Sequence, residues 1–284
     1  MSDTAPQIPP SLATLRAEID RIDASMHALL IERSEIIANL ISVKGTQDSG
    51  SAFRPAREAA MMRKLVERHR GILPLDTVES IWRVIIATFT YVQAPYAVHA
   101  DLSVGEAAMR DTARFHFGFT VPLTPHIGAA GAIAAVAASK GDLALVPAMS
   151  IAGSGAWWTA LESGAAPKII ARLPFVERPD HPASLPVFAI SHPAAADAVA
   201  AEVEVYSVRV SGWGAAAART LAPLAEVIAE PDGAFDGAAL LISVPQGQTL
   251  AAITDALVKA GASVRSTALV GSHATRYTVA RSQI

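Results

Sequence analysis

The segment from Ser11 to Lys44 constrains the fold most, because it has the most regular hydrophobic period in the chain. Apolar residues recur there at three- and four-residue steps: Leu12, Leu15, Ile19, Ile22, Met26, Leu29, Ile36, Ile37 and Leu40. Neither proline nor glycine interrupts them. The pattern predicts a single long helix, roughly 50 Å in length at about 1.5 Å per residue. A helix of that length needs a long partner for its apolar stripe, either other helices or a second copy of itself.

Basic residues break the apolar stripe of this helix. Arg33 stands where the repeat calls for an apolar residue, and Lys44 follows in nearly the same direction, about 16 Å further along. Together they could hold one small anion. Arg16 is about 25 Å from Arg33 along the axis and on a different face, so one helix cannot bring both to the same ligand. A partner chain could supply Arg16, although each cation taken singly could be an ordinary solvated side chain.

Composition narrows the class of protein. The chain has 284 residues, 51% of them hydrophobic and 17% charged, which leaves room for two folded domains. A net charge of -3 gives no general attraction to nucleic acid or to an anionic membrane. The absence of cysteine excludes disulfides, a thiolate nucleophile and a cysteine metal site. Residues 1–10 are polar and proline-rich, so we expect a flexible leader without a signal peptide, and a cytoplasmic protein.

Proline and glycine divide the next fifty residues into two shorter helices. Pro55 suits the first turn of a second helix that runs to about Arg70. Asp76 and Glu79 form a capping-box pattern for a third helix, which Pro95 ends. The third helix is expected to bury one stripe, made of Ile81, Val84, Ile85, Thr88, Phe89 and Val92. Residues 11–96 therefore read as an all-α domain of three helices.

From about residue 100 the pattern changes to short β-branched runs that alternate with alanine-rich helical segments. This alternation predicts an α/β domain over residues 100–284. The strand candidates are Leu143 to Val146, Ile169 to Leu173, Val187 to Ile190, Val203 to Val210, Ala239 to Val244 and Ser263 to Val270. The helix candidates are Gly128 to Ser139, Ala194 to Ala201, Ala215 to Ala225 and Thr249 to Ala260. We expect a multidomain protein, all-α at its N-terminus and α/β beyond.

The helical part holds the residue types that a site for a small dicarboxylate needs. The set combines four cations, one acceptor and one neutral donor: Arg16, Arg33, Lys44, Arg57, Glu58 and Gln93. It contains no nucleophile, metal-ligand cluster or redox group. Such a set suits a reaction that needs only a fixed shape and an electric field around the substrate.

At these residues the sequence resembles the all-helical class of chorismate mutases. The resemblance covers roughly residues 11 to 95 and rests on several motifs in order: LRxxIDxID at Leu15 to Asp23, the pair Glu32-Arg33, Lys44, and PxRE at Pro55 to Glu58. It implies an intertwined homodimer that converts chorismate to prephenate, without a cofactor. In the shikimate pathway this step leads to phenylalanine and tyrosine.

The resemblance also implies a role for each site residue. Arg33 and Arg16 of the partner subunit would hold the carboxylates of chorismate. Lys44 and Gln93 would donate to the ether oxygen. Glu58 would accept from the ring hydroxyl, and Arg57 would add positive field. Thr88 and Phe89 complete the implied substrate-binding set, although Phe89 replaces an expected serine and Arg54 an often acidic residue.

The C-terminal part resembles prephenate dehydratases over short motifs. Gly141 to Gly155 is similar to a dehydratase segment, but Ala148 and Met149 stand at its acidic and amide positions. Two further segments are similar to motifs of that family: Ser191 to Ala196, and the run from Ala274 to Tyr277, which contains Thr275 and Arg276. Without the polar pair we expect no dehydration of prephenate, and we expect a chain ending near Ala100 to keep mutase activity. The alternatives are a bifunctional mutase and dehydratase, and a non-catalytic ligand-sensing protein.

Overall fold

The computed structural model describes residues 11–44, 52–193, 202–230 and 237–279. The chain divides into two compact units, Met1–Gln47 and Asp48–Ile284. Among the described helices, none combines the length and the hydropathy that a bilayer crossing requires.

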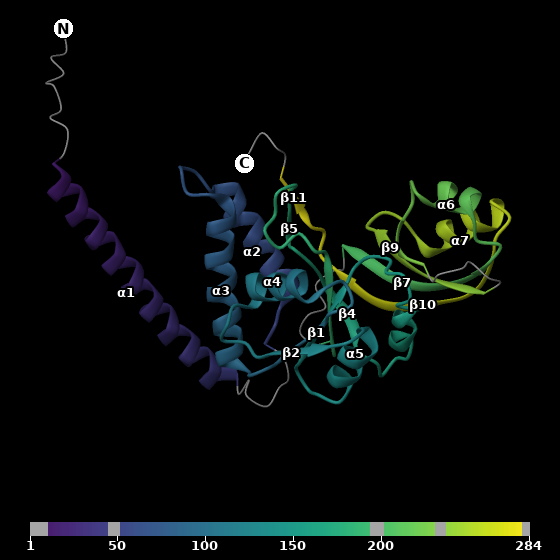
Figure 1. The fold of residues 1–284 in the computed structure, drawn as a ribbon, viewed down its shortest axis with the longest axis horizontal. Helices are drawn as coiled ribbons and strands as arrows, with labels where there is room; N and C mark the ends of the chain where they lie inside the picture. Colours follow the sequence, from purple (N-terminus) through teal and green to yellow (C-terminus); the bar gives the residue numbers. More distant parts are fainter. Residues whose placement is uncertain (1–10, 45–51, 194–201, 231–236, 280–284) are drawn as a thin grey trace, which may run out of the picture. The chain divides into compact units, whose positions relative to one another are not determined.

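The described part of the first unit is one helix, α1 (Leu12–Lys44), drawn in purple in Figure 1. This confirms the long helix predicted from the hydrophobic period. Ser11 caps its start, because its hydroxyl oxygen accepts from the backbone N–H of Thr14 at 3.2 Å. The apolar stripe stays in contact with solvent: Leu12 is 64% exposed, Ile19 56% and Leu29 63%.

The second unit begins with α2 (Pro55–Arg68) and α3 (Leu75–Gln93), which pack on each other. Proline at the start of α2 and the position of α3 agree with the prediction. The capping box does not form: Asp76 accepts only from the N–H of Thr77 at 2.8 Å, and Glu79 is fully buried. The expected buried stripe is also wrong, since α3 buries the opposite face, made of Leu75, Glu79, Arg83, Ile86, Ala87 and Thr90. That face packs on the rest of the unit, which leaves Ile81, Val84 and Val92 exposed.

Nine strands of the described chain form one sheet in the order β2-β1-β3-β6-β4-β10-β7-β9-β8. Their bounds are β1 Val98–Asp101, β2 Leu123–His126, β3 Leu143–Pro147, β4 Lys168–Leu173, β6 Val187–Ser191, β7 Val203–Ser211, β8 Glu226–Ala229, β9 Ala238–Pro245 and β10 Ser263–His273. The two short strands β5 (Val176–Glu177) and β11 (Tyr277–Thr278) pair separately. All six predicted strands are present, and the α/β class is confirmed.

The sheet has two halves that differ in connection. In the first half, β1, β2 and β3 run parallel and are joined by α4 (Glu106–Phe117) and α5 (Ala129–Ala137). The second half follows the chain order β7, α6 (Ala215–Leu221), β8, β9, α7 (Leu250–Lys259), β10, with neighbouring strands antiparallel. This is the split βαβ arrangement, and α6 and α7 lie side by side on it (Figure 1). A predicted helix, Ala194 to Ala201, lies outside the described residues.

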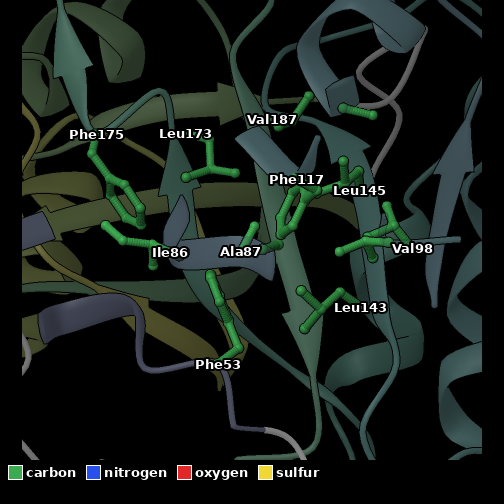
Figure 2. Close-up of a cluster of buried hydrophobic side chains, with 14 of the residues drawn as sticks. Phe53, Ile86, Ala87, Val98, Phe117, Leu143, Leu145, Leu173, Phe175 and Val187 are labelled. Carbon is green, nitrogen blue, oxygen red and sulfur yellow. The ribbon is translucent and has the colours of Figure 1, made fainter. Parts of the chain in front are cut away.

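The hydrophobic core joins the helices α2 and α3 to the sheet. Leu143 and Leu145 of β3 face a cluster that includes Phe117 of α4 together with Phe53 and Ile86 (Figure 2). Alternate residues of β3 face a second cluster under α5 and the short 3-10 helix η2 (Trp157–Leu161). The compact units therefore separate after Gln47, because α2 and α3 share a core with the α/β part. The functional domains, residues 11–96 and 100–284, remain a prediction.

Candidate active site

The predicted mutase residues are divided between the two units. Arg16, Arg33 and Lys44 lie on α1, with Arg16 exposed, Arg33 partly buried and Lys44 at the last position of the helix. The other predicted residues lie on α2 and α3. Each group has a defined helical position, and the roles of its members in binding remain predictions.

The PxRE motif on α2 places two charges in different environments. Arg57 is exposed, whereas Glu58 is only 4% exposed. The Glu58 carboxylate accepts from Arg83 of α3, with Nη1 to Oε2 at 2.7 Å. A buried carboxylate requires such a partner, because desolvation of an unpaired charge is costly.

Sequence reasoning missed Arg83. Its guanidinium is fully buried, donates to the backbone oxygen of His116 at 3.1 Å, and lies over the ring of Phe175 at 5.1 Å from its centroid. Its position among apolar neighbours, in the run IWRVII, is the one signal that could have found it.

Burial raises the pKa of the Tyr96 phenol, and the negative charge of Glu58 raises it further.

The remaining predicted residues lie near the end of α3. Thr88, Phe89 and Gln93 are all partly buried. The side-chain amide of Gln93 donates to the backbone oxygen of Phe89 at 3.0 Å. Since Gln93 Nε2 carries two N–H groups, this bond leaves one of them for a ligand.

A second charged pair connects α3 to the α/β part. Glu79 accepts from Arg178 Nη1 at 2.5 Å and from His181 Nε2 at 3.3 Å. His181 Nδ1 accepts from the N–H of Ala183, which leaves the proton on Nε2 for this contact. The His181 ring stacks on that of His116, at 6.2 Å between centroids. Burial, and then the positive charge of Arg83, lowers the pKa of His116 well below its usual value.

The dehydratase-like residues lie elsewhere in the second unit. Ala148 is buried and Met149 is 42% exposed at the end of β3. Thr275 and Arg276 lie between β10 and β11 and line a cavity of about 730 Å³. Arg276 pairs with Glu177 at 3.0 Å. In the described residues, no group of three or more His, Cys, Asp or Glu is arranged to hold a metal ion.

His273 lines the same cavity and is largely buried. Burial, together with the charges of Arg172 and Arg276, lowers its pKa to about 4. A hydrogen bond to the Ala274 carbonyl acts in the opposite direction and raises the pKa. The ring is therefore neutral near pH 7, with its Nδ1 proton donated to that carbonyl. The cavity presents polar groups, although its two arginines are already paired with Glu226 and Glu177.

Residues 15–94 match the family described as chorismate mutase type II. This segment of the chain is thus a chorismate mutase type II domain, as the motifs indicated. The match covers the predicted site residues on all three helices, from Arg16 to Gln93.

Two curated relatives are described as bifunctional chorismate mutase/prephenate dehydratase. The protein of Neisseria gonorrhoeae is 32% identical over 103 residues, which are 36% of this chain and 27% of that protein. The protein of Pseudomonas aeruginosa is 28% identical over 141 residues, 48% of this chain and 38% of that protein. The chain thus matches well under half the length of either relative.

Two solved structures show distant similarity. One is described as GqqA, a novel type of quorum quenching acylases, with a TM-score of 0.41 and 16% identity, over 63% of this chain and 95% of that one. The other is a prephenate dehydratase from Streptococcus mutans, with a TM-score of 0.37 and 15% identity, over 64% of this chain and 100% of that one. Similarity at this level carries no argument about the chemistry of this chain.

Proposed function

We propose that the protein is a chorismate mutase that converts chorismate to prephenate by an intramolecular [3,3] rearrangement. The observation that carries this proposal is the family match over residues 15–94, which contains the full set of site residues predicted from the sequence. We place the reaction in the biosynthesis of phenylalanine and tyrosine and the protein in the cytoplasm.

The proposed residues supply what a concerted rearrangement needs. The substrate must be held in a compact, chair-like conformer, and negative charge that develops on the ether oxygen must be stabilised as the C–O bond breaks. Arg33 and Arg16 of the partner subunit hold the two carboxylates. Lys44 and the free N–H of Gln93 donate to the ether oxygen, and Glu58 accepts from the ring hydroxyl. The residues themselves exchange no proton and form no covalent bond with the substrate.

A homodimer is part of this proposal. Arg16 and Arg33 lie about 25 Å apart along α1 by helical rise, so they serve one ligand only if they come from different chains. The exposed apolar stripe of α1 supports the same arrangement, since soluble proteins rarely leave a long apolar surface uncovered. A second copy of α1 would cover it.

A bifunctional mutase and dehydratase is the second candidate. It is favoured by Thr275 and Arg276, which line the cavity of about 730 Å³ in the α/β part. Against it, Ala148 and Met149 cannot supply the polar contacts that the dehydration of prephenate needs. We propose that the α/β part supports or regulates the mutase.

The substitution Lys44→Ala tests the mutase assignment. Loss of a fixed donor to the developing charge should lower kcat/KM for chorismate by about 100- to 1000-fold, with folding preserved. Lys64→Ala, at an exposed position of α2, is the matched control and should keep wild-type turnover. Near-normal turnover in Lys44→Ala would remove Lys44 from the site.

A further inference from the structure

The buried pair of Glu58 and Arg83 connects the mutase motif on α2 to the α/β part. Glu58 comes from α2, Arg83 from α3, and the carbonyl that accepts from Arg83 Nη2 belongs to His116 in the last turn of α4. One guanidinium therefore holds a carboxylate of the mutase motif and the end of a helix from the α/β part. Both side chains of the pair are at most 5% exposed.

The geometry fixes the carboxylate. Arg83 uses Nη1 for Glu58 and Nη2 for His116, so its planar fork cannot rotate without breaking one of the two bonds. The guanidinium of Arg83 also lies over the ring of Phe175. A carboxylate held by a fixed cation stays ionised and keeps one orientation, which is what an acceptor for a substrate hydroxyl requires.

We propose that Arg83 is a positioning residue of the mutase site, which holds Glu58 ionised and oriented and connects the site to α4 of the α/β part. This inference rests on the proposed function, because Glu58 is assigned to the ring hydroxyl of chorismate there. It gives the α/β part a definite effect on the mutase: a shift of α4 moves the carbonyl of His116, and through Arg83 the carboxylate of Glu58.

The second buried pair on α3 provides a matched control. Arg178 and Glu79 are as buried as Arg83 and Glu58, and they also join α3 to the α/β part. Glu79 is not among the predicted site residues. Arg83→Met and Arg178→Met should therefore lower the melting temperature to a similar extent, because each leaves one buried carboxylate without its arginine.

The experiment compares kcat, KM and their pH dependence for both variants with chorismate as substrate. We expect Arg83→Met to lose about 10- to 100-fold in kcat/KM at neutral pH, by analogy with the loss seen when a residue that orients a metal ligand is removed. Loss of the Arg83 charge favours the protonated form of the buried Glu58 carboxyl, so we expect the acid limb of the profile to move upward and activity to recover as the pH is raised. Arg178→Met should keep the wild-type profile.

The double variant Arg83→Met with Glu58→Gln separates positioning from a general effect. If Arg83 acts through Glu58, the kcat/KM of the double variant should be no lower than that of the less active of the two single variants, Arg83→Met and Glu58→Gln. If Arg83→Met does not fold, Arg83→Gln, which lacks the charge, carries the same test. An unshifted pH profile, or equal losses for Arg83→Met and Arg178→Met, would overturn the proposal while the mutase stands. Wild-type protein without activity on chorismate would overturn the function itself and this inference with it.

Discussion

At the scale of single residues, Gly271 joins the two halves of the sheet. It pairs with Ile169 of β4 at the one register position where β10 meets that strand. Its φ is 153°, and an added Cβ would lie 2.2 Å from the backbone oxygen of Ile169. Only glycine permits the two backbones to approach so closely, because any side chain would push the strands apart.

We therefore expect Gly271→Ala to destabilise the protein by about 1 to 3 kcal/mol or more, the cost of forcing extra volume into a packed interior. Urea unfolding at constant pH measures this. Gly164→Ala is the control, since no atom lies within 4 Å of an added Cβ there. An unchanged unfolding midpoint for Gly271→Ala would show that the strands separate at no cost.

The site illustrates which residues a sequence can reveal. Arg57 and Glu58 could be proposed from the PxRE motif, because a local pattern defines them. Arg83 was missed, since one arginine in an apolar run looks like a side chain that reaches solvent. Its role depends on His116 and Glu58, which are distant in sequence and meet it only in the folded chain. Pairing between remote charges leaves no local pattern.

At the scale of elements, the regularity of the residue pattern decided which helices and strands could be predicted. The helix α1 and the β-branched strands β3, β4, β6, β7, β9 and β10 were found because each has a long or strongly biased pattern. The strands β1 and β2 were missed. Each is only four residues long, and His99 in β1 and Pro125 and His126 in β2 give little strand signal. Helix α4 was missed for a similar reason, as its charged and aromatic residues mask a short buried stripe.

The helix α3 shows how tertiary contacts override local patterns. Its sequence offers two apolar faces, and the prediction chose the wrong one. The buried face includes Glu79 and Arg83, which are acceptable inside only because each finds a charged partner. The same requirement explains the missing capping box, since Glu79 is committed to Arg178 and His181. A charged residue inside a helix is therefore ambiguous until its partners are known.

At the scale of the whole molecule, the shared core changes the expected result of truncation. From the sequence alone we expected a chain ending near Ala100 to keep mutase activity. In the folded unit, however, Phe53 and Ile86 pack against Phe117, Leu143 and Leu173, all beyond that point. Truncation would also remove two partners of α3 side chains. These are Arg178, which pairs with Glu79, and the carbonyl of His116, which accepts from Arg83.

We now predict that a chain ending at Ala100 does not fold cooperatively. Domain stabilities are only about 5 to 15 kcal/mol, so the loss of one side of a core is enough to unfold the rest. Thermal unfolding followed by circular dichroism should show a sharp transition for the full chain and a broad one for the short chain. If the short chain melts sharply and keeps kcat/KM within twofold of the full chain, the shared core is dispensable.

Chorismate turnover by mixed variants is a direct test of sites shared between two chains. Arg16→Ala and Arg33→Ala should each be inactive, because every site in such a homodimer lacks one arginine. After unfolding and refolding as an equal mixture, half of the dimers should be mixed, each with one complete site. We therefore expect about a quarter of the wild-type activity from a two-fold dimer that shares its sites. If the mixture stays inactive while the refolded wild type converts chorismate, sites shared between two copies of α1 are contradicted.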